Sequence, residues 1–121
     1  MKNMYQQRHN RVVDLVHNKI VSVKTSCEIV KDKVLKASDF CPNSENFRST
    51  NTRPDIVLIN REDKEVIIIE ISTPFDAFLG RCYSEKFNKY YPLSTEINAL
   101  GFRTRIFVLV IGSLAMYMKD L

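Results

Sequence analysis

Two short segments rich in valine and isoleucine, joined by a polar connection, constrain the fold of this chain most strongly. The segments are residues 55–59 and 65–72, and residues 60–64 join them. β-Branched runs of this length, bounded by polar residues, are typical of strands. A short polar connection between two such runs is typical of an antiparallel hairpin, and here it pairs Ile59 with Val66.

This pairing brings two acidic side chains together. Asp55 falls opposite Glu70 on a face whose other members are aliphatic, and opposed side chains have Cβ atoms about 5 Å apart. Like charges on such a face repel each other and lose hydration, so the arrangement is costly without a cation. Hard divalent cations such as Mg²⁺ bind clustered carboxylate oxygens. The sequence therefore predicts a metal site, provided that the register does not slip by one residue.

The hydrophobic pattern predicts helices on either side of the hairpin. Residues 5–23 carry apolar side chains at spacings of three and four, which places them on one face of a helix. Residues 78–91 form a second helix, and Pro92 opens a further helical segment that stops at Gly101. Residues 105–111 are almost continuously apolar, which is the pattern of a strand buried on both faces.

Three further segments complete the predicted order of elements. Residues 34–40 are expected to form a short strand, residues 26–31 are ambiguous, and residues 42–52 are polar, as in an exposed loop. The order is then helix, strand, strand, strand, helix, strand. It predicts one α/β domain over residues 1–121, with helices packed on a mixed sheet.

Composition limits the class of protein. With 121 residues the chain is the size of a single domain. Its longest apolar runs fall far short of the about 20 residues that span a bilayer, so we expect neither a membrane protein nor a classically secreted one. Three cysteines without CxxC spacing argue against a disulfide framework or a zinc cage, and they favour a reducing, intracellular compartment. The formal net charge of +4 is compatible with a nucleic-acid partner and almost as well with a solvated surface.

Two lysines on the second predicted helix are further candidates for chemistry. Lys86 falls near the middle of the apolar stripe of that helix, and Lys89 lies at its edge. A lysine that faces a carboxylate pair can compensate charge, position a water or stabilise a developing phosphorane. A lysine on an apolar stripe can also extend along the helix to solvent. Spacing alone leaves both alternatives open.

The ordered set of these residues resembles the PD-(D/E)XK nuclease superfamily, and within it the restriction-like endonuclease domain of non-LTR retrotransposons. The resemblance rests on three elements, namely Arg53-Pro54-Asp55, Glu70 and Lys86-Phe87-Asn88-Lys89-Tyr90. Two flanking elements also resemble that family, namely Arg8-His9-Asn10 and Ile111-Gly112-Ser113-Leu114. The superfamily's core motif would place a lysine at residue 72, where this chain has Ser72. In the retroelement branch the lysine comes from the following helix, which makes Lys86 the first candidate and Lys89 the second.

The resemblance implies a restriction-endonuclease-like αβββαβ core and metal-dependent hydrolysis of DNA. Asp55 and Glu70 would bind Mg²⁺ or Mn²⁺, together with the carbonyl of Ile71, and the metal would activate a water. Lys86 or Lys89 would position or deprotonate that water.

The resemblance also implies which residues hold DNA. Arg53 would bind a flanking phosphate, and Arg8 and His9 would belong to the DNA-binding set, although a buried, satisfied histidine is the common alternative for His9. Tyr90 would either pack beneath the site or contact the DNA backbone.

The resemblance further implies the setting in which such a domain works. A nick in target DNA would prime reverse transcription, and the domain would be part of a longer reverse-transcriptase polypeptide, nuclear if the retroelement is eukaryotic. Cleavage of both strands would need a homodimer or two sequential events. Two alternatives stay open, namely a non-catalytic DNA-binding remnant and a Holliday-junction-resolvase-like nuclease of the same fold.

Overall fold

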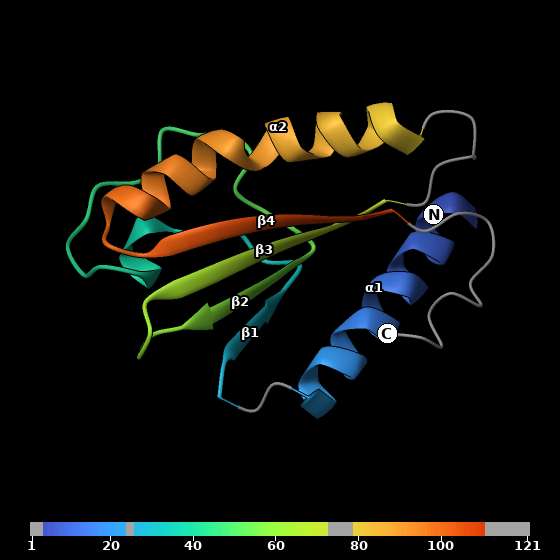
Figure 1. The fold of residues 1–121 in the computed structure, drawn as a ribbon, viewed down its shortest axis with the longest axis horizontal. Helices are drawn as coiled ribbons and strands as arrows, with labels where there is room; N and C mark the ends of the chain where they lie inside the picture. Colours follow the sequence, from blue (N-terminus) through green and yellow to red (C-terminus); the bar gives the residue numbers. More distant parts are fainter. Residues whose placement is uncertain (1–3, 24–25, 73–78, 111–121) are drawn as a thin grey trace.

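The computed structural model describes residues 4–23, 26–72 and 79–110, which form a four-stranded mixed sheet between two helices (Figure 1). In chain order the elements are α1 (Met4–Val23), β1 (Glu28–Lys31), the 3₁₀ turn η1 (Ala37–Asp39), β2 (Ile56–Asn60), β3 (Glu65–Ser72), α2 (Leu79–Ala99) and β4 (Arg103–Val110). The strands lie in the order β1-β2-β3-β4. β2 pairs in antiparallel fashion with both β1 and β3, and β4 runs parallel to β3. This arrangement is the predicted αβββαβ core.

The hairpin of β2 and β3 has the predicted register. Ile59 pairs with Val66. In the connection, the side-chain oxygen of Asn60 accepts the Asp63 N–H at 3.0 Å, and Lys64 adopts a left-handed φ of 54°. An asparagine that bonds the backbone in this way stabilises a tight turn. The connection therefore has a defined turn conformation, and this sets the register in which the two strands pair.

Two apolar clusters hold the helices to opposite faces of the sheet. The cluster beneath α2 contains Leu35, Phe40, Val57, Ile59, Val66, Ile68, Tyr90, Leu93, Ile97 and Phe102. The cluster beneath α1 contains Val12, Val13, Val16, Ile56, Leu58 and Ile71. β2 contributes to both clusters because successive side chains of a strand point to opposite faces. Burial of each large aliphatic side chain contributes about 1.5–3 kcal/mol.

The first strand lies earlier in the chain than predicted. Residues 34–40 do not form a strand, and the ambiguous region before them supplies β1, which pairs with β2. In the later segment the Asp39 carboxylate accepts the Lys36 N–H at 2.8 Å and closes the 3₁₀ turn. This turn directs Leu35 and Phe40 into the core beneath α2.

The second helix continues through Pro92, so the predicted break there is wrong. Proline removes one helical N–H and disturbs the carbonyl four residues earlier, which here belongs to Asn88. Pro92 and Asn88 are both exposed, so the defect lies on the solvent side of the helix. Leu93 and Ile97 are fully buried against the sheet, and this packing holds the second half of the helix in line. Neither of the helices that the structure describes has an apolar stretch long enough to cross a membrane.

β4 is an edge strand with exposed side chains on one face, so the prediction of a strand buried on both faces is wrong for its described part. Among the described residues it has a strand neighbour on one side only. Val108 is buried, whereas Arg105 is exposed and the Phe107 side chain is 52% exposed. The apolar run reflects one face packed against α2 and a second face that α1 leaves partly open. Residues 111–114, part of the family resemblance, lie outside the described residues.

Candidate functional site

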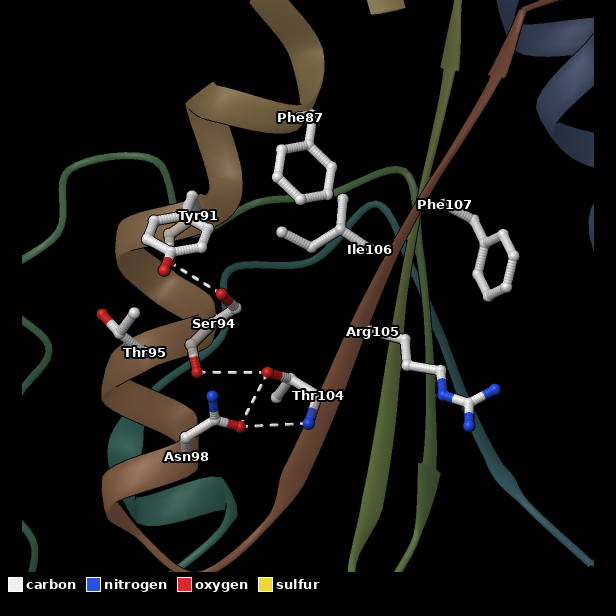
Figure 2. Close-up of a pocket in the computed structure, with 9 residues that line it drawn as sticks. All are labelled: Phe87, Tyr91, Ser94, Thr95, Asn98, Thr104, Arg105, Ile106 and Phe107. Atoms are coloured by element: carbon white, nitrogen blue, oxygen red, sulfur yellow. Dashed lines mark hydrogen bonds between the residues drawn. The ribbon is translucent and has the colours of Figure 1, made fainter. Parts of the chain in front are cut away.

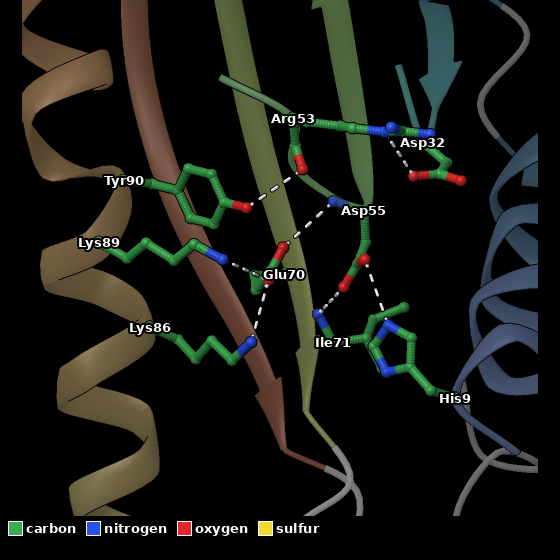
Figure 3. Close-up of polar contacts among 9 residues, drawn as sticks. All are labelled: His9, Asp32, Arg53, Asp55, Glu70, Ile71, Lys86, Lys89 and Tyr90. Carbon is green, nitrogen blue, oxygen red and sulfur yellow. Dashed lines mark hydrogen bonds and ion pairs between the residues drawn. The ribbon is translucent and has the colours of Figure 1, made fainter. Parts of the chain in front are cut away.

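The predicted site residues meet at one end of the sheet, between α1 and α2 (Figure 3). Asp55 directly precedes β2, and Glu70 lies near the end of β3. The helix α1 contributes His9, and α2 contributes Lys86, Lys89 and Tyr90. Figure 3 shows Glu70 directed toward α2, and the Asp55 carboxylate directed toward His9.

The two carboxylates are connected through the backbone of the two strands. The Asp55 N–H donates to Oε2 of Glu70 at 3.1 Å, and the Ile71 N–H donates to Oδ2 of Asp55 at 2.8 Å. Each strand therefore orients the carboxylate of the other. The two acids are adjacent, as the hairpin register predicts, but the prediction that their side chains share one face is wrong, because the Asp55 carboxylate faces His9 of α1 and Glu70 faces α2 (Figure 3).

Glu70 is the most buried acid of the site. Only 4% of the residue is exposed. Nζ of Lys86 donates to its Oε1 at 3.2 Å, and Nζ of Lys89 lies 3.9 Å from the same oxygen. Burial and the neighbouring Asp55 charge raise the pKa of Glu70 above its usual value, although Lys86 opposes them.

In Asp55 the influences that lower the pKa prevail over burial, the reverse of Glu70. Burial raises the pKa of its carboxyl group, but the hydrogen bonds from His9 and the Ile71 N–H outweigh burial, so this pKa lies below its usual value. Nε2 of His9 donates to Oδ1 of Asp55 at 3.3 Å. The same bond raises the pKa of His9, with burial opposing it. His9 is thus a satisfied histidine at the site rather than an isolated core residue.

Tyr90 packs beneath the site, the first of its two predicted roles. It is 1% exposed, and its Oη donates to the Arg53 carbonyl at 3.2 Å. The ammonium of Lys89 lies 5.1 Å from the centroid of its ring, within the range of a cation–π contact. Burial and the nearby carboxylates raise the pKa of Tyr90, so it remains a neutral hydrogen-bond donor.

Arg53 is at the rim of the site, where its Nε donates to Oδ1 of Asp32 at 3.0 Å. Sequence analysis assigned no role to Asp32, because its partners are remote in sequence and an aspartate after a strand carries no distinctive signal. Arg8 belongs to α1, and its side chain lies outside the described part of the structure.

The donor set suits a hard divalent cation. The carboxylates of Asp55 and Glu70 are adjacent, and oxygen donors of this kind bind Mg²⁺ or Mn²⁺. Within the described residues no three His, Cys, Asp or Glu side chains form a ready set of metal ligands. The side chains would therefore supply two carboxylates, and a backbone carbonyl such as that of Ile71, or water, would complete the set.

Two of the cavities lined by described residues bear on the site. One, of about 340 Å³, is lined by His9, Asn10, Val13, Asp14, Lys31, Asp32 and Asp55. It gives access to Asp55 from the α1 side. The other, of about 390 Å³, lies between α2 and β4 (Figure 2). Its lining includes Phe87 and Tyr91 but no carboxylate, and Figure 2 shows Arg105 and Phe107 on the opposite side of β4 from Phe87. Only the first cavity is a candidate for the metal chemistry.

Comparison with known proteins places the fold. No family model and no curated protein matches the chain. A solved structure of an N-terminal domain of a reptarenavirus L protein is similar to it, with a TM-score of 0.60 and 17% sequence identity. The match covers 82% of this chain and 48% of that one, so this chain spans about half of that structure. The likeness is one of fold alone, and it is consistent with the predicted restriction-endonuclease-like α/β core.

Proposed function

We propose that this chain is a metal-dependent endonuclease that hydrolyses phosphodiester bonds of DNA. The observation that carries the proposal is the almost fully buried carboxylate of Glu70, which lies beside Asp55 and faces two lysines. A stable core gains nothing from two adjacent acids at the end of a sheet. Perturbed acids beside a basic side chain are instead typical of catalytic sites.

Each residue has a distinct part in this proposal. Asp55 and Glu70 would hold Mg²⁺ or Mn²⁺, and a metal bound there would supply Lewis-acid chemistry for phosphodiester hydrolysis. Lys86 stays close to Glu70, where its ammonium would orient an attacking water and balance charge on the phosphate. His9 and the Ile71 N–H keep the Asp55 carboxylate ionised and fixed.

The first test is nicking of a supercoiled plasmid by the wild type, Asp55→Asn and Glu70→Gln, with Mg²⁺, Mn²⁺ or EDTA. We expect metal-dependent nicking that falls by about 100-fold or more in both variants. Glu65→Gln is the matched control, because Glu65 lies on the same strand but pairs with Arg103 at the surface. Full activity in EDTA, or in Asp55→Asn, would contradict the proposal.

Cleavage of other substrates under the same metal conditions separates the alternative functions. An RNA oligonucleotide of equal sequence tests the sugar, and a four-way DNA junction tests a preference for branched substrates. Cleavage of RNA alone would replace DNA in the proposal. Binding without cleavage of any substrate would favour a non-catalytic DNA-binding module.

We infer a setting in a longer polypeptide from the resemblance to non-LTR retrotransposon domains, in which a nick in target DNA primes reverse transcription. The reptarenavirus structure is likewise described as a domain of an L protein. One domain carries one site and cuts one strand, so simultaneous cleavage of both strands would need a homodimer.

A further inference from the structure

Asp32 makes two contacts to the segment that carries the first carboxylate. It directly follows β1, with a left-handed φ of 49°. In this conformation its N–H donates to the Asp55 carbonyl at 2.9 Å, and its Oδ1 accepts Nε of Arg53 at 3.0 Å (Figure 3). A left-handed φ is uncommon outside glycine, although aspartate adopts it more readily than most residues. The bend at Asp32 therefore serves contacts with residues on both sides of Pro54.

Arg53 is held at two points, one on its backbone and one on its side chain. Its carbonyl accepts the hydroxyl of Tyr90, and its Nε is bound to Asp32. Among the described residues no other acceptor binds the guanidinium, so its two terminal nitrogens remain available for a ligand. The Arg53 side chain is 59% exposed. It thus presents a fork of donors to solvent in a set orientation at the rim of the site.

We propose that Asp32 is a positioning residue, which orients the Arg53 guanidinium to bind a backbone phosphate of the DNA next to the scissile bond. This inference rests on the proposed function, because it takes DNA as the substrate. Terminal guanidinium nitrogens bind phosphate in a bidentate manner. Fixing the side chain before binding removes the cost of ordering it in the complex.

A role in stability alone does not explain the pair. Ion pairs as exposed as this one contribute little to folding. The chain offers a comparison, since Arg61 and Glu28 form the same Nε–carboxylate contact at 2.9 Å with similar exposure, although Arg61 also donates to the Asp39 carbonyl. That pair lies at the other end of β1 and contacts none of the site residues.

The proposal predicts an effect opposite in sign to simple electrostatics. Removing Asp32 removes a negative charge, and DNA affinity would rise if net charge alone mattered. If Asp32 instead orients Arg53, DNA affinity falls. The substitution Asp32→Gly isolates this effect, because glycine adopts the left-handed φ without strain and retains the N–H that binds Asp55.

The experiment measures binding of the full chain to a short fluorescent DNA duplex by anisotropy, with Ca²⁺ in place of the catalytic metal. We expect Asp32→Gly and Arg53→Ala each to weaken binding by about 5- to 10-fold. The double variant should bind no more weakly than Arg53→Ala, since Asp32 acts through Arg53. Asp32→Asn, which keeps an acceptor for Nε, should remain within about 2-fold of wild type. The control Glu28→Gln should bind as tightly as wild type or more tightly.

Nicking kinetics and a second variant make the test independent of folding. Asp32→Gly should raise KM by a similar factor and leave kcat nearly unchanged, which a general loss of structure would not do. If Asp32→Gly does not fold, Arg53→Lys decides. It keeps the charge but loses Nε and the fork, so we expect binding to weaken nearly as much as in Arg53→Ala.

Each outcome has a defined meaning. If the wild type binds and nicks DNA while Asp32→Gly binds equally or more tightly, this inference is wrong and the proposed function stands. Unchanged binding by Arg53→Lys would also overturn it. If the wild type neither binds nor cleaves DNA, the proposed function fails and this inference with it.

Discussion

Lys86 and Lys89 approach the same oxygen of Glu70 from unequal distances, and this difference ranks them. Lys86 is in hydrogen-bond contact, whereas Lys89 lies 3.9 Å away and rests over the ring of Tyr90. A cation–π contact stabilises an ammonium where it stands and opposes its movement toward a reacting group. We therefore expect Lys86→Ala to slow single-turnover nicking by about 100-fold or more, and Lys89→Ala by about 10-fold at most. Equal losses in two variants with matching melting curves would show that this ranking is wrong.

The residues that sequence analysis found, and the one it missed, differ in how local their contacts are. The positions of Asp55 and Glu70 follow from one hairpin, whose short polar connection sets the register. Lys86 follows from a helical pattern and a family resemblance. Asp32 meets Arg53 across 21 positions of the chain, through the pairing of β1 with β2. No pattern in a single sequence reports that pairing, because β1 was itself ambiguous.

At the scale of elements, one acid of α2 fastens the loop of residues 42–52 to that helix. The Glu96 carboxylate accepts the N–H groups of Arg48 and Ser49 at 2.7 and 3.0 Å, and also the Ser49 hydroxyl. Burial raises the pKa of Glu96, but these hydrogen bonds outweigh it, so the pKa lies below its usual value. The stabilisation is therefore present above the unfolded-state pKa and is lost as pH falls through the folded-state pKa.

Glu96→Gln should lower the free energy of unfolding by about 1 kcal/mol at neutral pH, since the contacts are partly exposed. The difference from wild type should shrink as pH falls from about 5 to about 3, where the wild-type carboxyl becomes protonated. Urea unfolding at several pH values measures this. Glu62→Gln, in the exposed hairpin connection, is the control that should show no such change. A difference that stays constant over this range would contradict a role for the charged carboxylate.

Two of the errors in predicting elements have a common physical cause. Pro92 and the apolar run of β4 carry strong local signals, and tertiary packing changes the outcome of both. Leu93 and Ile97 keep α2 continuous through the proline. The position of β4 at the edge of the sheet leaves Phe107 half exposed. Local propensity is a weak guide where the neighbouring layer determines what is buried.

At the scale of the whole molecule, the site depends on all three layers. The sheet supplies both carboxylates, α1 supplies His9 and α2 supplies the lysines (Figures 1 and 3). The order of patterns along the chain was enough to predict this layered α/β fold. The same patterns placed both carboxylates on one face of the hairpin, whereas Asp55 faces α1 and Glu70 faces α2, because their orientation depends on hydrogen bonds formed only in the folded sheet.

This arrangement predicts a link between metal binding and the stability of the whole domain. A cation that binds only the folded chain stabilises it by about 2.7 kcal/mol at a hundredfold excess over Kd, which raises Tm by roughly 10 °C for a domain of this size. Glu70→Gln should abolish this rise in Mn²⁺. In EDTA its Tm should equal or exceed that of the wild type. Burial and the neighbouring Asp55 charge raise the pKa of Glu70, which means that its charged form is unfavourable there, and the substitution removes that charge.

Thermal melting in EDTA and in Mn²⁺ measures both effects on one sample. Glu65→Gln, on the same strand, should keep the full Mn²⁺ shift, because Glu65 lies at the far end of β3 with Arg103. If Glu70→Gln melts well below the wild type in EDTA and still gains stability from Mn²⁺, Glu70 is a structural partner of Lys86 rather than a metal ligand. A gain in metal-free stability together with loss of the Mn²⁺ shift would mean that the buried acid is retained for binding, at a cost to the fold.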